Sequence, residues 1–238
     1  MAEPVALEPH LRAAREAGRK LLIPYVTGGL GDDWVDVVEA CVAAGADAVE
    51  VGIPFSDPVM DGSTIQAASE RALAQGTTLD SVLDDLRAAR IGVPVVAMTY
   101  ANLVFHKGYA RFAQEAIACG IAGVILPDLP LEELGEWAPH AEAAGLATVQ
   151  LASPLSSDDR LAALCEATQG YVYGVNLLGV TGERASLTDS AVALAKRLKA
   201  TTDKPVVMGF GISTPEQAVD LAAHADGVIL GSVLMRMR

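Results

Sequence analysis

The chain has 238 residues, of which 51% are hydrophobic and 20% are charged, so it can bury a large core and does not belong to the disordered class. Its formal net charge is −13 at pH 7, and it has no run of Lys and Arg that could follow a phosphate backbone, which argues against nucleic acid as a partner. An anionic substrate is compatible with this charge, because backbone N–H groups can hold a phosphate locally.

Eight short apolar segments alternate with amphipathic stretches along the chain. In order, the apolar segments are LLIPYVT (21–27), AVEVGI (48–53), PVVAMTY (94–100), GVILPD (123–128), ATVQLAS (147–153), YVYGVN (171–176), PVVMGFG (205–211) and GVILGS (227–232). Their continuous apolar character is typical of parallel strands that are buried on both faces. The stretches between them are rich in Ala, Leu, Glu and Arg, and several end in Gly, which predicts helices.

Strand–helix units that follow one another without a linker predict a single TIM-barrel domain, an α/β fold of the (β/α)8 type, over residues 1–238. An open doubly wound sheet is the alternative, but the turn TGGLGDD after the first strand matches a dinucleotide-binding GxGxxG motif poorly. The sequence stops at GSVLMRMR, so we expect the final helix to be absent or reduced to a turn, with an apolar patch in its place. A shortened sequence explains this better than a partner that fills the gap.

Glu50 lies within the second apolar segment, and Asp61 lies in the loop that follows it. An unpaired carboxyl group in a core strand is destabilising, and burial raises its pKa towards neutrality, which suits acid–base catalysis. For Glu50 the alternative is a structural carboxylate bound by backbone N–H groups or by a buried arginine. Asp61 precedes Gly-Ser-Thr at a predicted helix start, so capping of that helix explains it about as well as catalysis does.

In a barrel of this type the active site forms at the carboxyl ends of the strands. The lysines lie before strands or in helices, so no Schiff-base nucleophile is evident, and the histidines form no metal-binding cluster. Tyr100 ends the third segment and Tyr173 lies in the sixth, so both can reach this face. For Tyr173, which belongs to the sequence YVY, core packing is the more common role of an aromatic residue.

Glycines recur after the last three predicted strands, in GVTGER (179–184), GFGIS (209–213) and LGS (230–232). Glycine lets backbone N–H groups approach an anion closely, and the last loops of such barrels commonly hold a phosphate. A phosphorylated substrate is therefore favoured over three unrelated tight turns.

Cys41, Cys119 and Cys165 have no metal-binding spacing and are expected to be buried free thiols, which suits a reducing compartment. The sequence also lacks a signal peptide and any run of about 18 apolar residues. These features indicate a soluble cytoplasmic protein.

The motifs GADAVEVGIPFSDPVMDGSTIQ, MTYANLVF, GVILPDLPLEE, GVTGER and GFGISTPEQA resemble, in this order, those of the tryptophan synthase alpha subunit family. The resemblance runs from about Tyr25 to Ser232, and the first motif is specific to that family among barrels. It implies a lyase of tryptophan biosynthesis that cleaves indole-3-glycerol phosphate to indole and glyceraldehyde 3-phosphate. The implied chemistry is a carboxylate acid–base retro-aldol reaction without a metal or cofactor in this subunit.

The resemblance also implies roles for individual residues. Glu50 would be the acid–base group for the glycerol hydroxyl and indole C3, Asp61 would accept from the indole N–H and stabilise positive charge on the ring, and Tyr173 would position the substrate. The phosphate site would comprise Gly182, Gly211, Gly231 and Ser232. The indole pocket would be lined by Tyr25, Met98, Ile125 and Phe210, with Thr181 in a loop that closes towards Asp61. The family leads us to expect a phenylalanine at position 25, where this chain has tyrosine.

A beta subunit that contains pyridoxal phosphate and receives indole through a tunnel is the partner that the resemblance implies, in a heterotetramer of two alpha and two beta subunits. Its contacts would come from Pro54, Phe55, Asp57, Asn102 and Asp128, each of which also has an ordinary loop or turn role. Two other functions are weighed: a non-catalytic barrel that activates a partner, and another lyase or isomerase of a phosphorylated substrate. The presence of both Glu50 and Asp61 argues against the first, and the SDPVMDG motif argues against the second.

Overall fold

The computed structural model describes residues 4–175, 184–209, 211–212 and 214–238, without the side chains of 184–188. Eight parallel strands form a closed barrel in sequence order, and β8 pairs with β1. The strands are β1 (Leu21–Thr27), β2 (Val49–Gly52), β3 (Val95–Met98), β4 (Ile121–Ile125), β5 (Ala147–Ala152), β6 (Val172–Val175), β7 (Val206–Gly209) and β8 (Gly227–Leu230). The predicted TIM barrel is confirmed, and the open sheet is excluded.

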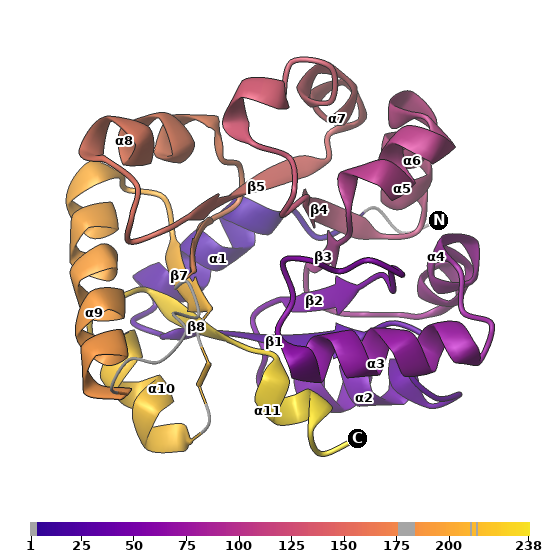
Figure 1. The fold of residues 1–238 in the computed structure, drawn as a ribbon, viewed down its shortest axis with the longest axis horizontal. Coiled ribbons are helices and arrows are strands. Elements are labelled where there is room, and N and C mark those ends of the chain that lie inside the picture. The colour runs from indigo at the N-terminus through magenta and orange to yellow at the C-terminus, as the bar shows by residue number, and fades with distance from the viewer. Residues whose placement is uncertain (1–3, 176–183, 210, 213) are drawn as a thin grey trace.

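Helices surround the barrel (Figure 1). They are α1 (Leu7–Glu16), α2 (Trp34–Ala43), α3 (Ser63–Ala74), α4 (Leu79–Ala88), α5 (Ala101–Lys107), α6 (Tyr109–Ala118), α7 (Ala138–Ala144), α8 (Asp158–Ala167), α9 (Arg184–Thr201), α10 (Pro215–Ala222) and α11 (Ser232–Met235), with a 3-10 helix η1 at Leu131–Glu133. Within the part of the chain that the structure describes, none of these helices has both the length and the apolar character needed to span a bilayer.

The barrel interior is filled by apolar side chains, and α1 closes its amino-terminal end. Leu7 and Leu11 of α1 are 3% and 0% exposed and pack on the residues that the strands direct inward. Glu8 of the same helix accepts the Gly170 N–H ahead of β6 at 3.2 Å. Burial of both leucines favours folding by roughly 2 kcal/mol each. At the opposite end of the barrel, the carboxyl ends of the strands lead into the loops that connect them to the helices.

The element after β8 is the single turn α11, which packs against α3 and β1 (Figure 1). Met235 of this turn is 4% exposed. A final helix reduced to a turn was expected and is confirmed. Leu22 of β1 and Leu230 of β8 are only partly buried on the outside of the barrel, where an apolar patch was expected.

Buried aspartates at the amino-terminal end tie neighbouring strands together. Asp226 is 8% exposed, accepts the Val206 N–H at 2.8 Å and accepts from the Lys199 ammonium with both carboxylate oxygens at 2.9 and 2.8 Å. Asp47 is 3% exposed and accepts the Leu22 N–H at 2.9 Å. These contacts satisfy backbone groups that would otherwise be buried without a partner.

We expect Asp226→Ala to lower the free energy of unfolding by about 3 kcal/mol, because a buried N–H and an ammonium group lose their acceptor. Chemical denaturation followed by circular dichroism measures the change. Asp203→Ala is the matched control, because Asp203 pairs with Arg12 and Arg15 but its side chain is 86% exposed. Its expected loss is much smaller, because solvent screens an exposed ion pair. Equal losses in the two variants would contradict the role assigned to Asp226.

Candidate active site

Glu50 lies in β2 with its side chain inside the barrel and is 0% exposed. Its Oε1 accepts a 2.5 Å hydrogen bond from the Tyr171 hydroxyl, and its Oε2 is buried without a partner among the described residues. Burial raises the pKa of Glu50 from its usual 4.5 to about 8, and the hydrogen bond from Tyr171 opposes the shift. Because Tyr171 is its partner, the alternative of a carboxylate paired with a buried arginine is not supported. A carboxyl group with this pKa can both donate and accept a proton near neutral pH.

Asp61 lies in the loop between β2 and α3 and is partly buried. The Tyr100 hydroxyl donates to its Oδ2 at 3.2 Å and accepts the Met60 N–H at 3.0 Å. The N-cap of α3 is Gly62, so Asp61 does not cap this helix and the capping alternative is wrong. Burial raises the pKa of Asp61 to about 6, and the hydrogen bond from Tyr100 opposes this shift. A second carboxyl group that titrates near neutral pH therefore lies beyond the carboxyl end of β2.

The side chains of Tyr25 and Tyr173 each pack against a glycine of the next strand. Tyr25 is the register partner of Glu50, and its hydroxyl is 1.8 Å from where a Cβ on Gly52 would lie. The Tyr173 hydroxyl is 2.3 Å from where a Cβ on Gly209 would lie. Both positions require glycine, because any side chain there would collide with a tyrosine ring.

Both of these tyrosines are close to the two carboxyl groups. Burial raises the pKa of Tyr25, and the charges of Asp61 and Glu50 add to the effect. The pKa of Tyr173 is raised by burial and then by the charges of Glu50, Tyr25 and Asp61. Both hydroxyls therefore stay protonated at neutral pH and act as neutral hydrogen-bonding groups.

Tyr171, which the sequence reasoning did not select, is the residue that contacts Glu50. It is 0% exposed, and its ring centroid is 6.4 Å from that of Tyr173. Residues two apart in a strand point to the same side. The signal was thus present in YVY: if Tyr173 faces the interior, so does Tyr171.

The proposed phosphate residues that the structure describes lie at the ends of two paired strands, β7 and β8. Gly211 has a φ of 26°, which favours glycine. Gly231 is the N-cap of α11, and Ser232 is the first residue of that helix. Gly182, the fourth predicted phosphate residue, lies outside the described residues.

The predicted indole-pocket residues that the structure describes come from three strands. Tyr25 is in β1, Met98 ends β3 and Ile125 ends β4, and the last two are register partners that pack on the core inside the barrel. Ile125 is 0% exposed. Thr181 and Phe210 lie outside the described residues.

The residues predicted to contact a partner lie in the loops that follow β2 and β4 and, for Asn102, in helix α5 after β3. Pro54 is buried, and Phe55 stacks on Tyr100 with ring centroids 4.9 Å apart. Asp57, Asn102 and Asp128 are exposed, and Asp128 accepts the Ala101 N–H at 2.9 Å. The sequence reasoning missed the exposed apolar side chains in the same loops and in α5, which are Val59, Met60 and Phe105 at 78%, 52% and 65% exposure.

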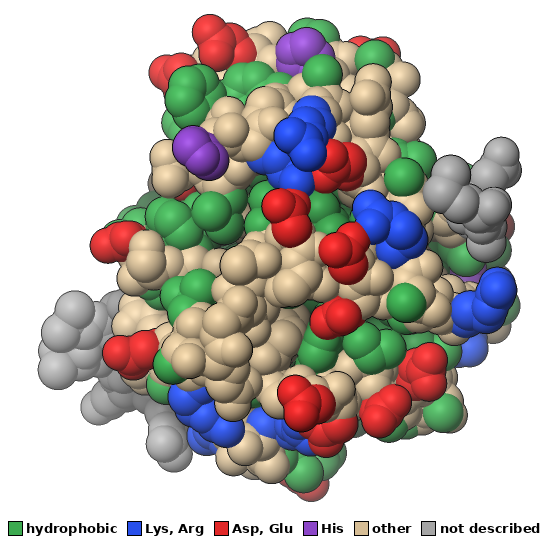
Figure 2. All heavy atoms as spheres, turned by 90° about the vertical axis from the view of Figure 1, so that its right-hand side faces the viewer, with side chains coloured by type: hydrophobic (Ala, Val, Ile, Leu, Met, Phe, Trp, Pro, Cys, Tyr) green, Lys and Arg blue, Asp and Glu red, His purple; other side chains and the backbone are tan. Residues whose placement is uncertain are grey.

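Figure 2 shows the side of the molecule that carries α4, α5 and α6. Basic side chains lie there in separate groups, and acidic side chains gather at the lower right. Ion pairs on these helices join Lys107 to Asp80 and Glu115, and Arg111 to Glu115. This face therefore offers no continuous basic surface for a polyanion.

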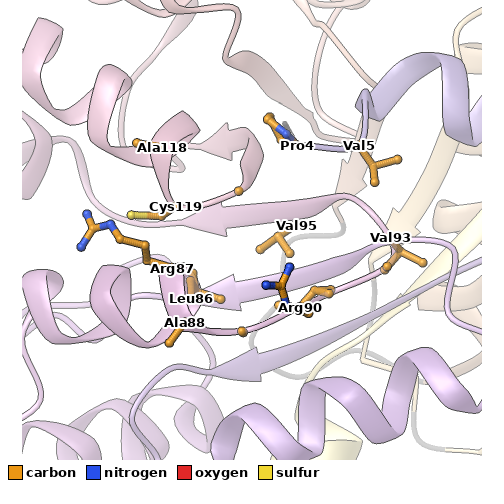
Figure 3. Close-up of a pocket in the computed structure, with 14 residues that line it drawn as sticks. Pro4, Val5, Leu86, Arg87, Ala88, Arg90, Val93, Val95, Ala118 and Cys119 are labelled. Carbon is orange, nitrogen blue, oxygen red and sulfur yellow. The ribbon is translucent and has the colours of Figure 1, made fainter. Parts of the chain in front are cut away.

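A cavity of about 330 Å³ lies at the other end of the barrel, between the end of α4, the start of β3 and the end of α6 (Figure 3). Its lining includes Leu86, Arg87, Arg90, Val95 and Cys119. Figure 3 shows Cys119 and Arg87 on one side of it and Pro4 and Val5 on another. None of the described residues that line this cavity carries a carboxyl group. It is separate from Glu50 and Asp61, and we place no chemistry there.

Comparison with known proteins identifies the family of the chain. The profile of the family described as tryptophan synthase alpha chain matches residues 11–237. Alpha chains of Streptomyces avermitilis and Halorhodospira halophila are 45% and 46% identical over 235 and 234 residues, which cover 97% and 95% of this chain and 85% of each relative.

Solved structures show the same relationship. Tryptophan synthase subunit alpha from Legionella pneumophila superposes with a TM-score of 0.87 at 36% identity, covering 97% of this chain and 87% of that one. A chain of Mycobacterium tuberculosis tryptophan synthase gives 0.89 at 40% identity, covering 98% and 91%. The chain therefore belongs to the tryptophan synthase alpha chain family, the lyases of tryptophan biosynthesis that cleave indole-3-glycerol phosphate to indole and glyceraldehyde 3-phosphate.

Proposed function

We propose that Glu50 is the acid–base catalyst of this lyase and that Asp61 stabilises positive charge on the indole ring. The observation that supports this most directly is a pair of carboxyl groups with pKa values raised to about 8 and about 6, on β2 and on the loop after it. An assay of indole release from indole-3-glycerol phosphate, with and without a beta subunit, tests the activity. A purified chain that released no indole under either condition would refute it.

The reaction moves one proton from a glycerol hydroxyl to indole C3 and breaks the bond between C3 and the carbon that carries the hydroxyl. Protonated Glu50 donates to C3 first, which places positive charge on the ring. Its carboxylate then takes the hydroxyl proton, the aldehyde forms, and the electron pair of the broken bond returns to the ring. The Oε2 atom of Glu50 has no partner among the described residues and is available for both transfers, while Tyr171 holds Oε1.

Asp61 acts on the ring side of the same reaction. Its carboxylate accepts the indole N–H and lies close to the positive charge that protonation of C3 creates. Tyr100 fixes this carboxylate through its hydroxyl, and stacking on Phe55 holds the Tyr100 ring. Tyr173 positions the substrate beside Glu50.

The pH profile of kcat/KM for cleavage is expected to be bell-shaped. The rate rises through about pH 6 as Asp61 ionises and falls through about pH 8 as Glu50 loses the proton that it must donate. Indole release measured from about pH 5 to pH 10 checks this. The substrate phosphate also titrates near pH 6, so the alkaline limb is the diagnostic one. A rate that still climbed at the alkaline end would contradict the role of Glu50 as the first proton donor.

We propose that Gly211, Gly231 and Ser232, together with Gly182, bind the substrate phosphate through backbone N–H groups and the serine hydroxyl. The adjacency of the ends of β7 and β8 and the left-handed Gly211 support this. The Phe210 ring would contribute to the indole pocket next to Tyr25, Met98 and Ile125, and Thr181 would lie in the closing loop.

Gly231→Ala is expected to raise KM about tenfold with little effect on kcat, because a methyl group keeps the phosphate from approaching the backbone. The fold should tolerate it, since the new Cβ would lie 3.5 Å from the Tyr25 Cβ, an ordinary contact. Steady-state kinetics measure the effect. Gly92→Ala is the control, because a Cβ at Gly92 meets nothing within 4 Å. Loss of kcat without a change in KM would remove Gly231 from the phosphate site.

We also propose that the chain acts with a beta subunit that carries pyridoxal phosphate and receives indole, in a heterotetramer of two alpha and two beta subunits. The exposed apolar side chains Val59, Met60 and Phe105 beside Asp57, Asn102 and Asp128 support a docking surface formed by these segments.

The barrel that runs from α1 to α11 supports a single domain for the whole chain. The free thiols Cys41, Cys119 and Cys165 favour work in the reducing cytoplasm.

A further inference from the structure

We propose that Tyr25 determines which ring-substituted indoles this enzyme accepts. Its hydroxyl makes one wall of the ring-binding space a hydrogen-bonding surface, so that a polar ring substituent is favoured over an apolar substituent of the same size. This inference rests on the proposed function of the site.

The Tyr25 side chain runs along the wall from the proposed phosphate site to the proposed ring site. Its Cβ lies 3.5 Å from where a Cβ on Gly231 would lie, at the end of β8. Its hydroxyl lies over Gly52, 1.8 Å from where that residue's Cβ would lie. Gly52 is two residues beyond Glu50 on the same face of β2, and the loop that continues from it carries Asp61. The hydroxyl end of Tyr25 is therefore placed at the ring end of the substrate.

Tyr173 has the same relation to Gly209 that Tyr25 has to Gly52. Among the charges that act on Tyr25, the strongest is that of Asp61, whereas for Tyr173 the strongest is that of Glu50. Both carboxyl groups act on both tyrosines, and the larger effect of Asp61 on Tyr25 supports a place for its hydroxyl on the proposed indole side.

A hydroxyl at this place affects selectivity because the site excludes water. Tyr25 is 6% exposed, and burial with two neighbouring carboxyl groups keeps its phenol protonated. A hydrogen bond with the Thr27 side chain acts on the Tyr25 hydroxyl and opposes the rise of its pKa. An apolar substituent that covers the hydroxyl prevents any further hydrogen bond, whereas a hydroxyl or amino substituent provides one. Sites that hydrogen-bond a substrate group discriminate strongly against analogues that lack it.

The test uses the reverse reaction, the condensation of glyceraldehyde 3-phosphate with indoles that carry either a hydroxyl or a methyl group at each carbon of the benzene ring. The readout is the ratio of kcat/KM for the hydroxyl and methyl compounds at one position, since these substituents are similar in size. At one or more positions the wild-type protein is expected to favour the hydroxyl compound roughly tenfold, and Tyr25→Phe is expected to abolish or reverse the preference.

Tyr109→Phe is the control, because Tyr109 lies in α6 and packs against Trp137, away from the site. It should leave every ratio unchanged. The inference is overturned if the wild-type protein favours the methyl compound at every position, or if Tyr25→Phe has the same ratios as the wild-type protein. A protein that did not condense indole itself would refute the proposed function, and with it this inference.

Discussion

Glu50→Gln is expected to lower kcat for cleavage of indole-3-glycerol phosphate at least about a thousandfold and to leave KM within about threefold. The amide keeps the shape of the side chain and can still accept the hydrogen bond from Tyr171, but it can neither donate a proton to C3 nor take one from the hydroxyl. Single-turnover and steady-state assays of indole release measure both constants.

Tyr171→Phe is the companion variant, because it keeps the carboxyl group and removes only the hydrogen bond to Oε1. That bond lowers the pKa of Glu50, so its loss should raise the pKa and move the alkaline limb of the pH profile to higher pH. We expect a loss of about tenfold in kcat from the less well oriented carboxyl group. Substantial turnover by Glu50→Gln would overturn the assignment of the catalyst, whatever the result for Tyr171→Phe.

The barrel could be predicted from the sequence because its strands are buried on both faces. Segments such as LLIPYVT and PVVMGFG are continuously apolar and are separated by helix patterns of ordinary length. Few folds other than a TIM barrel combine these two features. The main difference is at the fourth strand, which begins at Ile121, before the predicted residue 123. The Ala-Gly pair inside that strand conceals its start, because both residues are common in turns and helices as well.

Glu50 could be found from the sequence, but the atoms that contact it could not. A carboxyl group in an apolar strand is visible as a local anomaly. Its partner Tyr171 is 121 residues away and meets it only because the barrel closes and brings β2 and β6 to face the same interior. Two tyrosines in YVY share that interior, and nothing local tells which of them reaches β2.

The role of Asp61 was undecided for a related reason. Gly62 and the Ser-Thr pair after it suit a helix start, and local sequence favours capping as much as catalysis. In the structure Gly62 is the N-cap, and the Asp61 carboxylate instead accepts from the hydroxyl of Tyr100, 39 residues later. The closeness of Tyr25 to Gly52 is likewise a product of strand register, which a single sequence does not specify.

Asp61→Asn is expected to lower kcat by a factor of about 100 to 1,000, because the ring loses the negative charge that stabilises its protonated form. The amide oxygen can still accept the hydrogen bond from Tyr100, so the loop should keep its position, and the thermal midpoint should stay close to that of the wild-type protein.

The charge and the hydrogen bond can be separated by Tyr100→Phe, which keeps the carboxylate and removes the bond that lowers its pKa. In that variant the acid limb of the pH profile should move to higher pH, while activity well above pH 7 should exceed that of Asp61→Asn.

Asp32→Asn is the control for net charge. It removes an exposed carboxylate from the loop after β1 and should leave kcat within about twofold. Because the two Asn variants lose the same charge at the same end of the barrel, a general effect of net charge would lower both alike. If Asp61→Asn kept nearly full activity, Asp61 would be an anchor of its loop, and the stabilisation of the ring would have to come from another group.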